Sequence, residues 1–333
     1  MGDATAPLLV VLTGPTGSGK SELALQLAAR LEPTLPLEII SADSAQVYRG
    51  MDIGTAKPSA ERRRSVPHHL IDIRDPAQAY SAGDFVRDAH AAIRQIHARG
   101  RQPLLVGGTM LYLRALHRGL AALPPASAAV RAELDAQAQL EGWSALHAQL
   151  ARVDPAAAAR IAPADAQRIQ RALEVHRLTG VPISEWQRCA PGAAEPFHWL
   201  RYALLPADAD ARIALRARLA ARFAHMLQAG LFEEVRRLHA RGDLTGQHAS
   251  IRAVGYRQLW QVFTGGSSLA EAQRQAVIAT AQLAKRQLTW LRGEPQLVAL
   301  PLGAAELAGD ASAAAHVGRV EALAAEILGA RRA

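Results

Sequence analysis

The stretch GPTGSGKS at residues 14–21 decides how the rest of the chain is interpreted. It follows an apolar run, LLVVLT, and opens a helix-like segment, KSELALQLAARL. This is the context of the motif G-x-x-x-x-G-K-[ST], in which glycines let backbone N–H groups converge on an anion at a helix N-terminus. Lys20 supplies a mobile positive charge, and the Ser21 hydroxyl can hold Mg²⁺ beside bound phosphates. The predicted phosphate-binding residues are Gly14, Pro15, Thr16, Gly17, Ser18, Gly19, Lys20 and Ser21. The motif indicates phosphate binding, but it establishes neither hydrolysis nor ATP as the ligand.

Apolar runs and helical patterns alternate after this loop. Strand-like runs lie at residues 8–13, 37–41, 69–73, 103–106, 199–205 and 295–301. Ser81 and Asp84 form a capping-box-like start for a helix that Gly100 closes. The alternation predicts an α/β fold, in which a P-loop NTPase-like, parallel and doubly wound sheet core is flanked by helices.

The pattern changes in the middle of the chain. Residues 124–196 contain amphipathic helical patterns and no convincing strand, so we expect an α-helical insertion domain there. The insertion would interrupt a discontinuous core domain formed by residues 1–123 and 197–302. The Ala/Gly-rich tail, residues 303–333, is expected to be partly disordered.

Composition restricts the class of protein. The net charge of +8 suggests a polyanionic partner, although a general enrichment in arginine would explain it as well. The single cysteine, Cys189, excludes an internal disulfide and a cysteine-built zinc site, and no H-E-x-x-H pattern occurs. No apolar run approaches the roughly 18 residues of a membrane span, and the N-terminus lacks the pattern of a signal peptide. We therefore expect a cytoplasmic protein without membrane contact.

Lysine is rare in this chain. Among 38 basic residues only Lys20, Lys57 and Lys285 are lysines. Because an ammonium group is a compact point charge and a guanidinium a broad planar fork, the lysines can mark places where the fork does not fit.

Two further loops follow predicted strands. Asp43 in SADSAQVYRG and Thr109 in GGTML both come just after strand ends, where ligands bind in open α/β sheets. Asp43 could be a magnesium ligand, a general base, or only a turn or N-cap residue; Thr109 could orient a substrate or cap a helix. No predicted strand ends in the Asp-Glu pair of many ATPases.

Three groups of basic residues lie in the second half of the chain. Taken singly, each group is explained by a solvated helix face with aromatic core residues. Together with a phosphate loop they favour a nucleic acid, because basic, amide and aromatic side chains suit backbone phosphates and stacked bases. The groups are Gln167, Arg168, Gln170 and Arg171; Arg252, Tyr256 and Arg257; and Lys285, Arg286, Thr289 and Arg292.

With these motifs in order, the chain resembles the bacterial tRNA dimethylallyltransferases of the IPP transferase family. The resemblance rests on GPTGSGKS, SADSAQVYRGMDIGTAKP, HHLIDI, GGTMLYLRAL, RIQRALEVHRLTG, MLQAGLFEEV, RAVGYRQLW and AKRQLTWLR, and covers about residues 8–293. Gly17 departs from the family, which often has alanine at this position. The zinc-finger extension of the eukaryotic relatives is absent from this sequence.

The resemblance implies transfer of a dimethylallyl group from dimethylallyl diphosphate to N6 of the adenosine 3′ of the anticodon, in tRNAs that read codons beginning with U. The phosphate loop would then hold the diphosphate, with Mg²⁺ at Ser21. By the same resemblance Asp43 is the general base, Thr109 positions the attacking base, and Lys20 and Arg222 face the diphosphate. A monomer is expected.

The resemblance also implies contacts with the tRNA anticodon stem-loop. The residues carried over are Asp43, Ser44, Ala45, Gln46, Thr109, Arg131, Gln167, Arg168, Ile169, Gln170, Arg171, Arg252, Ala253, Val254, Gly255, Tyr256, Arg257, Lys285, Arg286, Gln287, Leu288, Thr289, Trp290, Leu291 and Arg292. Two other hypotheses remain open on the residues alone. One is a small-molecule or nucleoside kinase on a P-loop fold, and the other is a non-catalytic RNA-binding protein with a degenerate phosphate loop.

Overall fold

The structure is a computed structural model. It describes residues 6–188, 197–309 and 313–332. Cys189, the only cysteine, lies outside the described residues.

The chain divides into two compact units. The first consists of Met1–Leu113 with Pro196–Ala333, and the second of Arg114–Glu195. The first division falls inside α4 (Met110–Arg118), ahead of the expected boundary at residue 124. A helix that runs across a division gives no local sequence signal for it.

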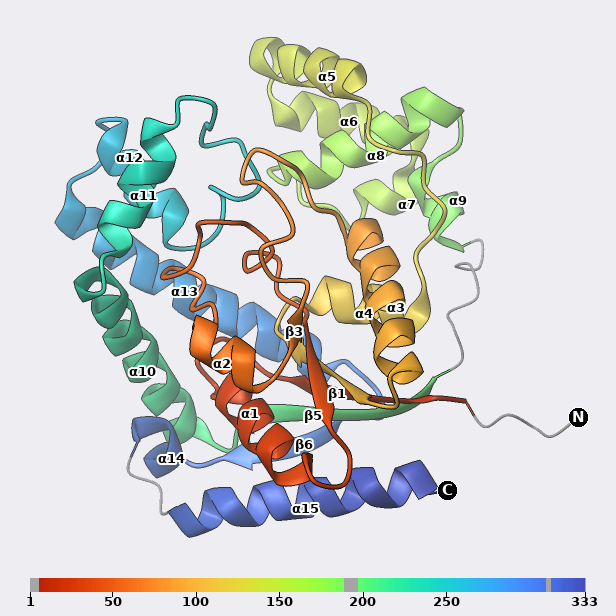
Figure 1. The fold of residues 1–333 in the computed structure, drawn as a ribbon. Helices are drawn as coiled ribbons and strands as arrows, with labels where there is room; N and C mark the ends of the chain where they lie inside the picture. The colour runs from red at the N-terminus through yellow and green to blue at the C-terminus, as the bar shows by residue number, and fades with distance from the viewer. Residues whose placement is uncertain (1–5, 189–196, 310–312, 333) are drawn as a thin grey trace, which may run out of the picture. The chain divides into compact units, whose positions relative to one another are not determined.

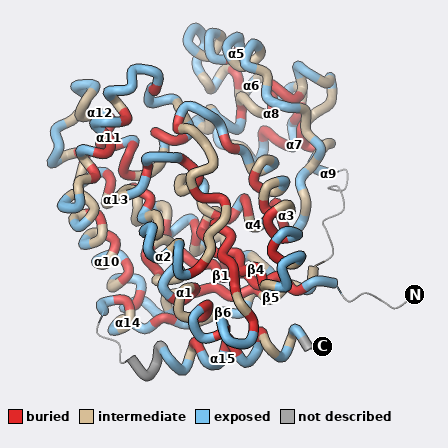
Figure 2. Tube along the Cα trace, in the orientation of Figure 1, coloured by how far each residue is buried: buried red, intermediate tan, exposed pale blue. Residues whose placement is uncertain are grey.

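The first unit is built on a six-stranded parallel sheet, shown in Figure 1. Its strands are β1 (Leu8–Thr13), β2 (Leu37–Ser41), β3 (His68–His69), β4 (Gln102–Gly107), β5 (His198–Pro206) and β6 (Val298–Leu302). The strand order is β3-β2-β4-β1-β5-β6. All residues of β1, β2 and β4 are buried, as Figure 2 shows for the middle of the sheet. Their near-continuous apolar sequences follow from burial on both faces. The predicted α/β fold with a parallel sheet is confirmed.

Helices surround this sheet. The Ser81 hydroxyl accepts a hydrogen bond from the Asp84 N–H, and the Asp84 carboxylate accepts one from the Ser81 N–H, so the predicted capping box is confirmed. Among the described residues no helix combines the length and apolarity needed to cross a membrane. The helices of this unit, besides α4, are α1 (Lys20–Leu31), α2 (Ala60–Ser65), α3 (Ala82–Ala98), α10 (Ala209–Gln228), α11 (Leu231–Ala240), α12 (Tyr256–Phe263), α13 (Leu269–Arg292), α14 (Ala304–Ala308) and α15 (Ala313–Arg332).

The C-terminal residues are part of the core, which corrects the expectation of a partly disordered tail. Leu323 and Ile327 of α15 are buried in one cluster with Val10 of β1 and Leu27 of α1. Figure 1 shows α15 passing below α1, at an angle to it. Alanine-rich composition suggested a weakly folding tail, yet alanine is also the best helix former, and the spaced leucine and isoleucine supply the apolar contact.

The third strand is shorter than expected. A strand over residues 69–73 was predicted, but only His68–His69 pair with β2. Leu70 and Asp72 have φ values of 63° and 58°, in the left-handed region that breaks an extended strand. Asp72 leaves the strand direction to accept hydrogen bonds from Lys57 and Arg63.

The second unit is helical, as predicted for the insertion. Its core contains Leu134, Leu146, Leu150, Ile169 and Leu173, all fully buried. Its helices, besides the end of α4, are α5 (Ala128–Glu141), α6 (Trp143–Val153), α7 (Pro155–Ala158), α8 (Ala166–Thr179) and α9 (Ile183–Arg188).

Candidate active site

Three loops meet at one edge of the sheet. The loop of residues 14–19 follows β1, the loop of residues 42–58 follows β2, and the loop of residues 108–109 follows β4. Since β2, β4 and β1 are adjacent parallel strands, their carboxyl ends place these loops side by side. This edge is where an open α/β sheet binds its ligand.

The phosphate loop has the backbone geometry of an anion cradle. Gly17 and Gly19 have φ values of 78° and 88°, which L-residues with side chains rarely adopt. In the part of the chain that the structure describes, the N–H groups of Gly17, Gly19, Lys20 and Ser21 donate to no protein acceptor. Four free donors at the start of α1 fit a phosphorylated ligand.

Gly14 is required by close packing. A Cβ atom there would lie 2.8 Å from the Leu204 carbonyl oxygen and 2.8 Å from the Ser18 Oγ. At Gly17 a Cβ would lie 2.7 Å from the end of the flexible Leu219 side chain. An alanine at this position needs a shift of that leucine and also strains the backbone, whose φ is 78°.

Charges of opposite sign gather beside the loop. Burial lowers the pKa of Lys20 to about 8, and the positive charge of Arg222 lowers it as well, whereas Asp43 opposes both effects. Burial likewise lowers the pKa of Arg222, again opposed by Asp43. The structure thus brings together Lys20, Asp43 and Arg222, which lie far apart in the sequence.

Asp43 is oriented by its own loop. Its Oδ1 atom accepts hydrogen bonds from the N–H groups of Ala45, at 2.8 Å, and Gln46, at 3.2 Å. Its Oδ2 atom accepts none from any described residue. Asp43 therefore acts as a turn residue through Oδ1, as one of the sequence interpretations had it. Its Oδ2 atom is available to a substrate proton.

Thr109 joins two of the loops. Its N–H donates to the Ala42 carbonyl at 3.2 Å, and its Oγ1 accepts the Ser44 N–H at 3.1 Å. The side chain is half-buried. The Thr109 hydroxyl donates in turn to the Ser44 Oγ at 3.5 Å, so Thr109 holds the Asp43 loop against the end of β4.

Gln287 connects α13 to the site. Its Oε1 atom accepts the Thr16 N–H at 2.8 Å, and its Nε2 donates to the Gly108 carbonyl at 2.7 Å. A Cβ at Gly108 would lie 2.6 Å from that Nε2 atom, so the glycine makes room for the amide. The resemblance placed Gln287 among RNA contacts, but its side chain is buried and holds the phosphate loop.

We expect Gln287→Ala to lower the free energy of unfolding by about 1–3 kcal/mol, because it leaves the Thr16 N–H and the Gly108 carbonyl without partners. Gln282→Ala on the exposed side of the same helix is the control and should change it by less than about 0.5 kcal/mol. Chemical denaturation measures both. Equal stability of the two variants would contradict the structural role.

A carboxylate fixes the far part of the loop after β2. Glu234 of α11 accepts hydrogen bonds from the N–H groups of Asp52, Ile53 and Gly54, at 2.9, 2.9 and 3.2 Å. The Tyr256 hydroxyl donates to the same carboxylate. No sequence pattern predicts this role, because a lone glutamate on a helix does not reveal which N–H groups it will meet.

Lys57 completes the restraint of this loop. Its buried ammonium donates to the Tyr48 carbonyl at 2.8 Å and pairs with Asp52 and Asp72, each at 2.5 Å. Three acceptors converge on one point charge, a geometry that suits lysine better than the planar fork of arginine.

Tyr256 is a structural residue and does not stack on a base, which corrects the interpretation of RAVGYR. Its side chain is fully buried, and a Cβ at Gly54 would lie 2.5 Å from its ring. Burial, followed by the Glu234 charge, raises the pKa of its hydroxyl. The tyrosine therefore stays protonated and donates to Glu234.

Tyr256→Phe is expected to lower the free energy of unfolding by about 1–3 kcal/mol, because a buried carboxylate loses a donor. The phenylalanine keeps the ring, so RNA affinity should stay within twofold of the original. Denaturation and RNA titration report the two effects separately. A loss of RNA affinity without a loss of stability would restore the stacking role.

In the second unit, two predicted RNA contacts hold the fold. The carboxylate of Glu174, fully buried, accepts hydrogen bonds from Arg131, at 2.9 and 3.1 Å, and from Arg171, at 2.6 Å. Burial raises the pKa of Glu174, but these hydrogen bonds and one from the Ser127 N–H leave it below the usual range. Arg131 and Arg171 therefore neutralise a buried charge, and Arg131 also ties α5 to α8.

The remaining carried-over residues differ in exposure. Each contiguous range also includes core positions: Ile169, Gly255 and Leu291 are buried. The side chains of Ile169 and Leu291 are therefore turned away from a partner. Gln170 bonds to Asp135 at 2.7 Å. Half-buried positions are Ala45, Gln46, Ala253, Val254, Leu288 and Trp290. Exposed positions are Ser44, Gln167, Arg168, Arg252, Arg257, Lys285, Arg286, Thr289 and Arg292.

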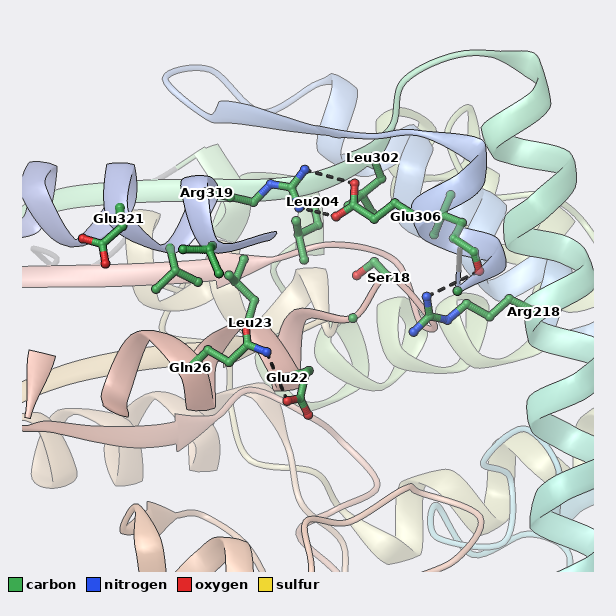
Figure 3. A pocket seen from close by; sticks show the side chains of 15 residues that line it. Ser18, Glu22, Leu23, Gln26, Leu204, Arg218, Leu302, Glu306, Arg319 and Glu321 are labelled. Atoms are coloured by element: carbon green, nitrogen blue, oxygen red, sulfur yellow. Dashed lines mark hydrogen bonds and ion pairs between the residues drawn. The ribbon is translucent and has the colours of Figure 1, made fainter. Parts of the chain in front are cut away.

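A cavity of about 590 Å³ lies on the other side of the phosphate loop. Figure 3 shows Ser18 at its centre, with Leu23 of α1 and Arg218 of α10 around it. The Ser18 Oγ is buried and, among the described residues, has no hydrogen-bond partner. Glu306 and Arg319 form an ion pair on the α14–α15 side.

The sheet, the phosphate loop and the charges beside it together define a class of protein. The parallel sheet carries a phosphate loop with free N–H donors, and Lys20, Asp43 and Arg222 cluster at its carboxyl edge. These are the features of a P-loop protein whose loop fits a phosphorylated ligand. The chain belongs to the IPP transferase family, whose model matches residues 46–294.

Similar proteins span nearly the whole chain. A tRNA dimethylallyltransferase of Bordetella pertussis is 55% identical over 309 residues, which cover 93% of this chain and 96% of the relative. The tRNA dimethylallyltransferase of Thioalkalivibrio sulfidiphilus is 52% identical over 297 residues, covering 89% and 91%.

Solved structures share the fold. The full-length tRNA isopentenylpyrophosphate transferase of Bacillus halodurans aligns with a TM-score of 0.68 and 36% identity, covering 97% of this chain and 96% of that one. A eukaryotic dimethylallyltransferase captured acting on tRNA aligns with a TM-score of 0.72 and 27% identity, covering 94% and 78%.

Proposed function

We propose that this chain transfers a dimethylallyl group from dimethylallyl diphosphate to N6 of the adenosine 3′ of the anticodon, in tRNAs that read codons beginning with U. The family and its tRNA-modifying relatives support this activity. The observation that carries it is the convergence of Asp43, Lys20 and Arg222 beside the free N–H groups of the phosphate loop. A carboxylate within the field of two cations suits a reaction that removes a proton and expels an anion.

The reaction forms a bond between N6 of adenine and C1 of the dimethylallyl group, while the bond between C1 and the diphosphate oxygen breaks. Negative charge grows on the diphosphate, where Lys20, Arg222 and the loop N–H groups stabilise it. The N6 proton passes to the free Oδ2 atom of Asp43. The adenine must leave its base stack to reach this carboxylate.

Mg²⁺ is part of the proposal. Ser21 is exposed in the first turn of α1, and its hydroxyl has no partner within the described residues. No group of three or more His, Cys, Asp or Glu side chains able to hold a metal ion occurs in the described ranges. The residues fit Mg²⁺, which keeps several waters and binds through substrate phosphates with few protein ligands. When bound, it would add positive charge beside the diphosphate.

Labelled dimethylallyl diphosphate and unmodified tRNA test the proposal. Label should pass to tRNA, and digestion should locate it on the adenosine next to the anticodon. ATP turnover without label transfer would favour the kinase hypothesis. RNA binding without either reaction would favour the non-catalytic one. We also propose that the protein works as a monomer in the cytoplasm, which sedimentation and cell fractionation would check.

A further inference from the structure

The seam between α10 and α13 opens into a basic groove. The groove has a volume of about 380 Å³. Among the described residues, none that lines it carries a carboxylate. The apolar lining residues are Leu215, Leu219, Ala281, Ala284 and Leu288, and the polar ones are Arg212, Arg216, Lys285, Thr289 and Arg292.

The four cations of this groove are free to bind an anion. Arg212, Arg216, Lys285 and Arg292 are exposed, and among the described residues none forms an ion pair. Two carboxylates lie at the start of α10: Asp208 accepts the Ala211 N–H at 2.8 Å, and Asp210 lies in the first turn. Like charges gathered without a counter-charge repel one another, so a bound anion stabilises the arrangement.

The cations form two rows rather than one pocket. Arg212 and Arg216 are four residues apart on α10, and Lys285, Thr289 and Arg292 follow one face of α13. Residues spaced by four on a helix lie about 6 Å apart, close to the spacing of successive phosphates along a nucleic acid strand. Arg212 and Arg216 have this spacing, whereas Lys285 and Arg292 are seven residues apart. Charges spread along two helices in this way favour a polyanion over a single compact anion.

We propose that this groove binds the phosphodiester backbone of RNA and that Arg212 and Arg216 are phosphate contacts, a role that rests on the proposed function for the identity of the RNA. Only the α13 row lies in a stretch that sequence resemblance carries over. The α10 row adds two contacts and turns one charged helix face into a two-sided clamp.

The groove adjoins the phosphate loop through buried side chains. Leu219 on its floor packs against Gly17, and Gln287 on the opposite side of α13 bonds to the Thr16 N–H. The two helices that grip the RNA backbone are therefore the helices that pack on the diphosphate site.

The variant Arg212→Ala/Arg216→Ala tests the clamp. Affinity for an anticodon stem-loop RNA is measured by fluorescence titration at several salt concentrations. Each lost phosphate contact should reduce the slope of log Kd against log salt by about 0.7–0.9, so the double variant should lose about 1.4–1.8. Affinity at physiological salt should fall by at least tenfold.

Two controls isolate the effect. Arg274→Ala, on the same α13 but paired with Glu271 at 2.7 Å, removes a charge outside the groove and should leave the slope unchanged. Arg212→Lys/Arg216→Lys keeps both charges and should keep the slope. Thermal melting confirms that each variant is folded.

Three results overturn the proposal. The first is an unchanged salt slope in the double alanine variant, and the second is an equal loss in Arg274→Ala. The third is a raised KM for dimethylallyl diphosphate with unchanged RNA affinity, which would indicate that the groove binds the small diphosphate and not RNA. RNA titration measures binding and needs no turnover. It therefore tests the RNA clamp even if the unaltered protein transfers no dimethylallyl group. A failure of that transfer would count against the proposed function alone.

Discussion

Asp43→Asn is expected to lower kcat by about 10²–10⁴-fold, the range of a positioned general base. The asparagine keeps a carbonyl-type oxygen that accepts the N–H groups of Ala45 and Gln46, so the loop keeps its shape. It removes only the ability of the second oxygen to take a proton. Single-turnover transfer to tRNA measures the effect, and tRNA affinity should fall by less than about fivefold.

Comparison with Asp43→Ala separates chemistry from loop structure. Alanine removes both the proton acceptor and the loop hydrogen bonds, so its activity should be no higher than that of the asparagine variant, and its stability should be lower. A near-normal single-turnover rate in Asp43→Asn would eliminate the base assignment and leave Asp43 as a turn residue.

Lys20→Met has the second largest expected effect. The methionine keeps the apolar stem and removes the ammonium that neutralises the departing diphosphate. Loss of one preorganised charge of this kind lowers kcat/KM for dimethylallyl diphosphate by about 10²–10³-fold. Tritium transfer at limiting isoprenoid measures it, and tRNA affinity serves as the control, since Lys20 faces the phosphate loop.

The depressed pKa of Lys20 adds a pH signature. Lys20 in the free enzyme is charged below a pH of about 8 and loses its proton as the pH rises through that value. Because kcat/KM reports groups of the free enzyme, it should fall above about pH 8. Lys20→Arg, whose guanidinium stays charged, should lack this alkaline limb even if its overall rate is lower. The same limb in both enzymes would assign it to another group.

The two predictions bear differently on the choice between a transferase and a kinase. A kinase needs a phosphoryl acceptor and a triphosphate, and ATP would depend on Lys20 too. Only the transferase also requires a carboxylate that takes a proton from an adenine amine. The pair of variants therefore tests the leaving group and the nucleophile separately.

The succession of strands and helices along the chain could be predicted well from the sequence alone. LLVVLT, the glycine-rich loop and the alternation of strands with helices are local patterns, and they predicted the parallel core and the helical insertion. They also placed Asp43 and Thr109 at strand ends, where the structure finds them. Local patterns succeed here because strand burial and loop conformation depend on neighbouring residues.

Other features were missed because they depend on partners distant along the chain. The residues around Gln287 do not predict its hydrogen bond with the Thr16 N–H. Those around Glu234 do not predict its bonds with the N–H groups of Asp52 and Ile53. The RNA contacts were also expected over unbroken stretches of sequence, which contain both exposed and buried residues. Tyr256 was therefore expected to stack on a base, although its side chain is buried.

The sequence thus determined that the chain has a phosphate loop on a parallel sheet, because the required backbone conformations are encoded by adjacent glycines and apolar residues. Only the tertiary structure decided which charges act together. Lys20, Asp43 and Arg222 meet, and the rows of α10 and α13 line one groove, because the packing of helices and strands that are distant along the chain brings these side chains together. No local pattern specifies that packing.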